Sequence, residues 1–301
     1  MSFSADVKKE LCRIEEENGC CVKAELAGIF AFCSVERDGD FILRTENELV
    51  AKRAAKLLEQ VFAIAIKEET LSRGANGALY TIKLTENIGL KTVLSGLGLY
   101  QNNMIKFAID PFLTQQPCCA QAYLRGAFLG GGSVNSPKRS YHFEIETHYF
   151  GLSRDLSALF SDLDFEVKTV MRKGSYVSYI KDSEKIGDIL AIMGATGSMM
   201  DLYNAKIEKE VNNSVNRRVN CDTANLTKTV NAAVAQANCI RQLVAKKGAE
   251  AIPEHLRELA DLRLSYPEAS LADLSEMLST PISKSGVNHR LKKLMELAQQ
   301  L

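Results

Sequence analysis

Hydrophobic and polar positions follow the same plan twice within residues 21–205. Each copy opens with an apolar helical segment of small side chains, and Gly28 and Gly126 hold equivalent places in the two segments. Apolar and polar residues then alternate with the period of two that predicts a half-buried strand. An amphipathic helix, two short strands and a closing apolar helix follow. The order αββαββα, given twice, predicts an α+β tandem duplication.

The two copies span about 22–100 and 118–200, after a helical N-terminal segment at 1–20. The elements predicted for the first copy are a helix at 25–32, a strand at 41–45, a helix at 48–63, strands at 65–68 and 79–84, and a helix at 87–97. Those of the second copy lie at 123–130, 142–146, 152–163, 165–171, 176–180 and 184–193. Two unrelated α+β modules that are similar by chance are the alternative to a duplication.

The pattern changes beyond residue 205. Residues 206–222 are polar, rich in asparagine and without a clear hydrophobic period, which predicts a linker between domains. Apolar residues then recur at helical spacing from 226 to 244, and Gly248 marks the end of that helix. Pro253 suits the first turn of another helix. Residues 223–301 are therefore predicted to form an all-α domain.

Two helices flanking a tight turn are predicted near the C-terminus. Ser270 and Asp273 have the spacing of a capping box, and Pro281 interrupts the helix that they begin. Ser283 can cap the next helix, whose buried face is formed by Val287, Leu291 and Leu294. This arrangement predicts a helix-turn-helix.

The second of these helices carries a local cluster of positive charge. The chain as a whole has a net charge of zero and an isoelectric point near 6.9, so no global field attracts it to nucleic acid. Between Lys284 and Lys293, however, four cationic residues occur without a carboxylate. A helix of this kind fits the major groove of double-stranded DNA, where amides and hydroxyls read bases and lysines bind phosphates. The alternative is an ordinary solvated, lysine-rich helix.

We predict DNA contacts from the turn, the second helix and the linker. The residues in the turn and the helix are Ser283, Lys284, Ser285, Asn288, His289, Arg290, Lys292 and Lys293. Backbone contacts are expected from Arg217 and Arg218 in the linker.

The cysteines do not have the spacing of a metal site. Eight cysteines are present, but no C-x-x-C occurs and no histidine has zinc-site spacing from them, so we expect reduced thiols, no metal and no cofactor. The N-terminus lacks the features of a signal peptide, and the apolar runs are shorter than the roughly 20 residues that span a bilayer. We expect a cytoplasmic, nucleoid-associated protein that does not bind membranes.

The two glycine-containing helices resemble the LAGLIDADG motif of homing endonucleases. In that family the eighth motif position is an acid that holds the divalent cation needed for DNA cleavage. The corresponding positions here are Cys33 and Gly131, and neither can bind magnesium as a carboxylate does. The resemblance therefore implies the architecture without the nuclease activity, and we expect the chain not to be an enzyme.

A degenerate LAGLIDADG duplication followed by a helix-turn-helix similar to region 4 of sigma factors resembles the WhiA family over nearly the whole chain. Residues 123–128, 216–222 and 282–291 carry this resemblance. It implies a transcription regulator at promoter DNA, tied to sporulation or to cell division and chromosome segregation in Gram-positive bacteria. RNA polymerase or another protein regulator is a further expected partner.

Two other functions fit the sequence less well. One is a metal-dependent endonuclease. The other is a duplicated domain that senses a protein or a nucleotide and passes that state to the DNA-binding end, with Arg125 in contact with a phosphate or partner. Pairing of Arg125 with a nearby acid is the more common outcome for such a residue.

Overall fold

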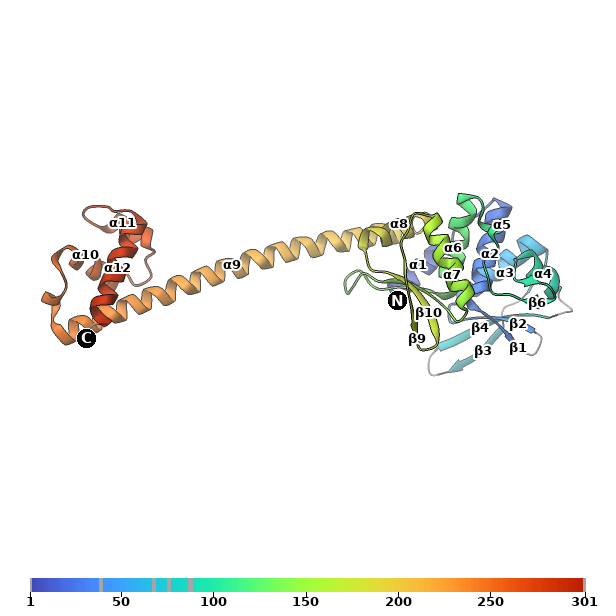
Figure 1. The fold of residues 1–301 in the computed structure, drawn as a ribbon, viewed down its shortest axis with the longest axis horizontal. Coiled ribbons are helices and arrows are strands. Elements are labelled where there is room, and N and C mark those ends of the chain that lie inside the picture. Colours follow the sequence, from blue (N-terminus) through green and yellow to red (C-terminus); the bar gives the residue numbers. More distant parts are fainter. Residues whose placement is uncertain (1, 38–39, 67–68, 75–76, 86–88, 300–301) are drawn as a thin grey trace. The chain divides into compact units, whose positions relative to one another are not determined.

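The computed structural model describes residues 2–37, 40–66, 69–74, 77–85 and 89–299 of the 301-residue chain (Figure 1). The chain divides into two compact units, Met1–Lys209 and Glu210–Leu301. Among the described residues, no helix combines the length and hydropathy required of a membrane span.

Unit 1 contains the same succession of elements twice, which confirms the predicted αββαββα order, although the strands at 34–37 and 132–134 were not located from the pattern. It opens with α1 (Phe3–Leu11). The first repeat consists of α2 (Gly19–Cys33), β1 (Ser34–Arg37), β2 (Asp40–Thr45), α3 (Glu48–Phe62), β3 (Glu69–Gly74), β4 (Gly77–Leu84) and α4 (Leu90–Gly96). The second consists of α6 (Pro117–Gly131), β7 (Gly132–Val134), β8 (Phe143–Thr147), α7 (Phe150–Asp162), β9 (Lys168–Arg172), β10 (Ser175–Ile180) and α8 (Ser183–Met193).

The two four-stranded sheets have equivalent topology. Their strand orders are β1-β2-β4-β3 and β7-β8-β10-β9, and every pairing is antiparallel. The register corresponds as well, since the first residue of β1, Ser34, pairs with Leu43, and the first residue of β7, Gly132, pairs with Ile145. Between the repeats lie β5 (Tyr100–Gln101), β6 (Met104–Ile105) and α5 (Pro111–Thr114), which the hydrophobic pattern did not predict.

Helices α2 and α6 form the centre of unit 1, and both are buried along most of their length. Gly28 and Gly126 allow the two backbones to approach closely. A Cβ atom on Gly28 would lie 2.7 Å from the Ala127 nitrogen, and one on Gly126 would lie 3.0 Å from the Ile29 nitrogen. Such distances leave no room for a methyl group, so glycine is required at both positions.

The strand predicted at residues 65–68 lies further along the chain in the structure. Residues 65–66 form no regular element, residues 67–68 lie outside the described part, and the strand is β3 at Glu69–Gly74. Ile64 and Ile66 are apolar because they pack against the core from a connecting segment rather than from a strand. The helix predicted at 87–97 begins at Leu90, and residues 86–88 are not described.

Unit 2 is helical, and its first helix corrects the predicted linker. Its elements are α9 (Thr196–Lys247), which begins in unit 1, the short 3-10 helix η2 (Ala249–Ala251), α10 (Glu254–Ser265), α11 (Leu271–Met277) and α12 (Lys284–Gln299). Residues 206–222 are helical within α9. The segment between Gly197 and Gly248 contains neither glycine nor proline, so its asparagines lower helix propensity without ending the helix.

Candidate nucleic-acid interface

Helix α12 rests on a small apolar core within unit 2. Val287, Leu291 and Leu294 are fully buried and belong to one cluster with Leu274 of α11 and Leu259 of α10. Burial of each large apolar side chain contributes about 1.5–3 kcal/mol. This core fixes which face of α12 remains exposed.

Capping bonds define where α11 and α12 begin. The Ser270 hydroxyl accepts from the Ala272 and Asp273 amides at 3.2 Å, and the Asp273 carboxylate accepts from the Ser270 amide at 2.8 Å, as the predicted capping box requires. This bond from the Ser270 amide lowers the pKa of Asp273. At the second helix, the Ser283 hydroxyl accepts from the Gly286 amide at 3.1 Å.

Hydrogen bonds hold the turn between α11 and α12 against the neighbouring helices. The Ser279 amide and hydroxyl donate to the two carboxylate oxygens of Glu258 in α10, at 2.6 and 2.9 Å. The Ser275 hydroxyl of α11 donates to the Ile282 carbonyl. These bonds hold the start of α12 against the rest of unit 2.

The predicted contact residues on α12 lie away from the core. Those exposed are Ser283, Lys284, Ser285, His289, Lys292 and Lys293, while Asn288 and Arg290 are half-buried. Within the described part of the chain, none of the four cations takes part in an ion pair. Their charge is therefore available to an anionic partner.

A groove of about 270 Å³ opens beside the start of α12. Its lining includes Lys228 and Gln236 of α9, Arg263 of α10, and Lys284 and Asn288 of α12. Gln236 Oε1 and Arg263 Nε are buried and lack a hydrogen-bond partner among the described residues. Burial lowers the pKa of Arg263. The groove therefore places two exposed lysines, Lys228 and Lys284, beside the buried guanidinium of Arg263.

The two linker arginines lie on a helix instead of in a turn-rich segment. Arg217 and Arg218 are exposed residues of α9 within unit 2. Their positions relative to each other are thus fixed by helical geometry, which the sequence did not predict.

The two degenerate motif positions lie at adjacent helix ends. Cys33 is the last residue of α2 and Gly131 the last of α6, and a Cβ atom on the neighbouring Gly130 would lie 3.3 Å from the Cys33 nitrogen. The Cys33 thiol donates to the Ile29 carbonyl at 3.1 Å, and burial raises its pKa to about 12. Neither position supplies a carboxylate for a divalent cation.

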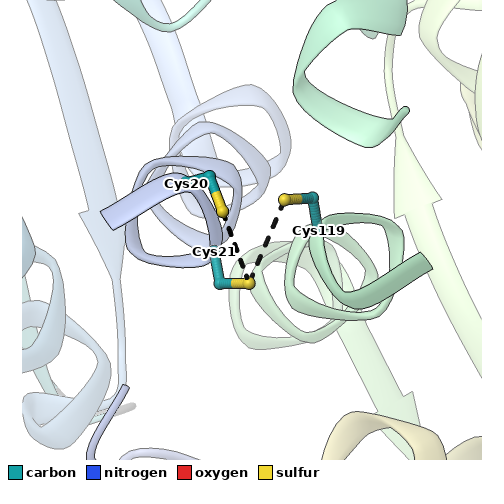
Figure 2. Close-up of side chains that lie close together, drawn as sticks. All are labelled: Cys20, Cys21 and Cys119. Carbon is teal, nitrogen blue, oxygen red and sulfur yellow. Dashed lines mark hydrogen bonds between the residues drawn. The ribbon is translucent and has the colours of Figure 1, made fainter. Parts of the chain in front are cut away.

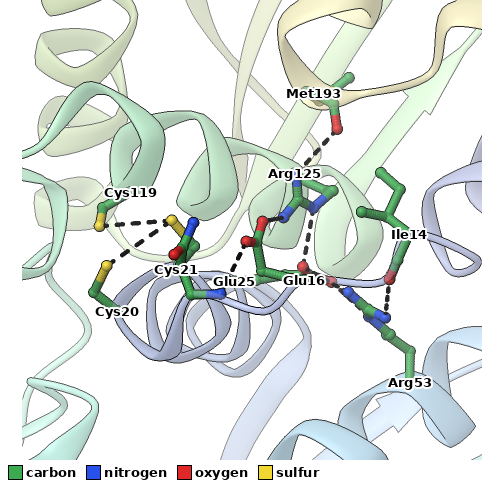
Figure 3. Close-up of polar contacts among 10 residues, drawn as sticks. Ile14, Glu16, Cys20, Cys21, Glu25, Arg53, Cys119, Arg125 and Met193 are labelled. Carbon is green, nitrogen blue, oxygen red and sulfur yellow. Dashed lines mark hydrogen bonds and ion pairs between the residues drawn. The ribbon is translucent and has the colours of Figure 1, made fainter.

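A buried ionic network joins the two motif helices (Figure 3). Glu25 of α2 accepts hydrogen bonds from Arg53 Nε at 2.8 Å and from Arg125 Nε at 2.9 Å, and the Arg125 guanidinium also contacts Glu16 at 3.2 Å. Arg125 is therefore paired with acids within the protein. The sequence singled out Arg125 but gave no sign that Glu25, 100 residues away, is its partner.

Three thiols lie together at the N-terminal ends of α2 and α6, although their spacing in the sequence did not predict a cluster (Figure 2). They belong to Cys20 and Cys21 in the first turn of α2 and to Cys119 in the first turn of α6. Burial raises the pKa of Cys119 to about 12 and also raises that of Cys21, whereas a hydrogen bond with Cys119 lowers the pKa of Cys20. A search for C-x-x-C misses such a cluster because its members come from different repeats. Comparison of the repeats would have found it, since each Cys-Cys pair ends seven residues before its motif glycine, Gly28 or Gly126.

Family models match both units. The model of the WhiA LAGLIDADG-like domain matches residues 120–212, and that of the WhiA C-terminal HTH domain matches residues 215–298. These matches confirm the predicted LAGLIDADG-like and helix-turn-helix domains.

Proteins named probable cell division protein WhiA are similar along the full chain. That of Alkaliphilus metalliredigens is 41% identical over 100% of this chain and 98% of its own length. That of Clostridium botulinum is 39% identical over 100% and 99%.

Solved structures agree in fold. Full-length DUF199/WhiA from Thermatoga maritima aligns with a TM-score of 0.60 and 22% identity over 100% of this chain and 99% of that one. The N-terminal LAGLIDADG domain of DUF199/WhiA aligns with a TM-score of 0.50 and 19% identity over 64% and 92%. With two domain models matched in order and full-length relatives about 40% identical, the chain belongs to the WhiA family.

Proposed function

We propose that this protein is a sequence-specific regulator of transcription that binds double-stranded promoter DNA and does not cut it. The observation that carries the proposal is the exposed, carboxylate-free stretch of α12 between Lys284 and Lys293, held on a capped helix-turn-helix core. The protein would act in the cytoplasm at the nucleoid.

The contact residues divide into two roles in this proposal. Ser285, Asn288 and His289 carry hydrogen-bonding groups that can read base edges in the major groove. Lys292 and Lys293 bind phosphates, as do Arg217 and Arg218 on α9. The groove beside α12 adds a phosphate position, because Lys228 and Lys284 both line it and are exposed.

Binding assays with the full chain test this division of roles. Genomic fragments are first selected by footprinting, and affinities are then measured by gel shift at fixed salt. Lys292→Ala should weaken binding to every fragment by a similar factor, because phosphate contacts carry no sequence information. Asn288→Ala should instead cost about 1–3 kcal/mol on preferred sites only, and so relax specificity.

Lys56→Ala is the matched control, since Lys56 is an exposed helical lysine of α3 in unit 1. It should leave binding unchanged. Equal affinity of the wild-type protein for all fragments, or no loss with Lys292→Ala, would overturn the proposal.

The absence of nuclease activity is tested on the same fragments. The carboxylates that would bind the catalytic cation are replaced by Cys33 and Gly131. Bound DNA should therefore stay intact in magnesium or manganese. Metal-dependent nicks that copurify with the protein would contradict this part of the proposal and leave the DNA-reading part untouched.

The cellular role rests on the relatives. Their name supports a role in cell division, and we place chromosome segregation and sporulation among the processes that such a regulator would control. RNA polymerase or a second regulator is the proposed protein partner at the promoter. Sequencing of DNA recovered with the protein from cells identifies the genes concerned.

A further inference from the structure

The start of the α2–α6 helix pair gathers sulfur from both repeats. Cys21 Sγ lies 4.0 Å from Cys20 Sγ and 3.9 Å from Cys119 Sγ, and all three sulfur atoms are within 4.8 Å of one another. Figure 2 shows the three side chains meeting in the space between the two helices. Cys21 and Cys119 are buried, while Cys20 faces solvent and leaves a route of access.

These distances are those of thiolates around one small cation. Tetrahedral zinc with Zn–S bonds of about 2.3 Å holds its sulfur ligands about 3.8 Å apart. Both measured separations that involve Cys21 are close to that value. A disulfide requires about 2.05 Å between its sulfur atoms, so the present arrangement is an open triangle of free thiols.

Two helix N-termini also meet at the cluster. Both Cys-Cys pairs lie in the first turn of a helix, since α2 begins at Gly19 and α6 at Pro117. The positive ends of the two helix dipoles stabilise negative charge there. Cys118 precedes Cys119 on the same turn of α6 and is exposed. Its sulfur atom is not among the three that lie within 4.8 Å of one another, so Cys118 would complete the site after a change of its side-chain rotamer.

We propose that Cys20, Cys21 and Cys119, with Cys118 as the fourth ligand, bind a structural zinc ion that ties the two repeats together. Thiolates select zinc over magnesium and calcium, which prefer oxygen ligands. The site is also at the opposite end of the helix pair from Cys33 and Gly131, so it is distinct from the lost nuclease cation site.

Metal content and spectroscopy of the full chain test the proposal. Protein prepared with zinc and then dialysed should retain about one zinc ion per chain by elemental analysis. Replacement by cobalt should give the near-ultraviolet thiolate charge-transfer band and the intense visible bands of tetrahedral coordination. Cys21→Ser and Cys119→Ser should abolish both signals, and Cys118→Ser should retain binding with reduced affinity and an altered cobalt spectrum.

Cys221→Ser is the matched control, because Cys221 is an exposed cysteine of α9 outside the cluster. It should bind zinc like the wild-type protein. Absence of zinc and of the cobalt band from the wild-type protein would overturn the proposal, as would full retention of zinc by Cys21→Ser.

Alkylation of the wild-type protein removes any dependence on how well the variants fold. Zinc should slow the reaction of iodoacetamide with Cys20, Cys21 and Cys119 and leave that of Cys221 unchanged, as read by mass spectrometry. Equal reaction rates with and without zinc would contradict the proposal. Recovery of a disulfide between Cys21 and Cys119 from freshly purified protein would overturn the zinc proposal and indicate a redox site instead.

Discussion

Glu25 is the residue on which the polar interior of unit 1 depends. It has no exposed surface, and its two oxygens accept hydrogen bonds from arginines of both repeats. Without the carboxylate, Arg53 would lose its ion pair and keep only a longer-range attraction to Glu16, and Arg125 would keep its ion pair with Glu16. A buried charge without a partner is far more destabilising than a broken surface pair.

Glu25→Gln should therefore lower the free energy of unfolding by about 3–5 kcal/mol, because two desolvated guanidinium groups lose their shared counter-charge. Urea denaturation followed by far-ultraviolet circular dichroism measures the change. Glu48→Gln is the control, since Glu48 pairs with Lys52 on the exposed surface of α3, and it should leave the midpoint almost unchanged. Similar midpoints for the two variants would show that the network contributes little.

Single residues also mark the limit of prediction from sequence. The positions of Gly28, Gly126 and Arg125 were evident from the repeat, because each interrupts an otherwise apolar pattern. Their contacts were not evident, since the register between α2 and α6 depends on how closely the two backbones approach. The same reason hid the cysteine cluster, which exists only once the two helices lie side by side.

At the scale of elements, local signals predicted best where they agreed with one another. The sequence predicted the two helix caps and the buried face of α12 correctly, because capping residues and helical periodicity are both local features. These are the caps at Ser270 and Ser283 and the face formed by Val287, Leu291 and Leu294. Prediction failed for residues 206–222, where asparagine suggested turns although no glycine or proline was present to end the helix. The β5–β6 pair was missed because two-residue strands carry no period.

Loss of the α11 cap should be detectable at the cap itself. Ser270→Ala removes the acceptor of the Ala272 and Asp273 amides and should cost about 1 kcal/mol locally, which corresponds to about fivefold faster amide hydrogen exchange in residues 271–277. Hydrogen exchange with mass spectrometry measures this. Ser285→Ala, which removes an exposed hydroxyl on α12, should leave exchange in that peptide unchanged.

The capping box also predicts a pH dependence. The pKa of Asp273 is lowered in the folded protein, so its stabilisation is present above the unfolded value of about 3.9 and is lost as the pH falls through the folded pKa. The difference in stability between Asp273→Asn and the wild-type protein should thus shrink below about pH 4, whereas Ser270→Ala keeps the backbone amide that lowers the pKa of Asp273. A constant difference down to the lowest pH at which both fold would contradict this account.

At the scale of the whole molecule, the balance of 37 basic and 37 acidic residues means that binding to DNA depends on where charges lie and not on their sum. The logarithm of affinity should fall linearly with the logarithm of salt concentration, in proportion to the number of phosphates contacted. Lys293→Ala should reduce the slope by about 0.9 if Lys293 neutralises one phosphate. Fluorescence anisotropy across a salt series measures the slope. The control Lys56→Ala should leave the slope unchanged. An unchanged slope for Lys293→Ala would show that Lys293 does not contact a phosphate.

The contact between Gly28 and Gly126 has a consequence for how such a chain can evolve. A larger side chain at either glycine would push against the backbone of the other repeat and move the sheet attached to it, so the two halves must change together. The restriction continues at the C-terminal end of α6, because a Cβ atom on Gly131 would lie 2.5 Å from the backbone carbonyl oxygen of Glu146 in β8. A carboxylate could therefore take the place of Gly131 only if the end of α6 moved away from β8, so the packing that keeps the two repeats compact also opposes the return of an acidic side chain there.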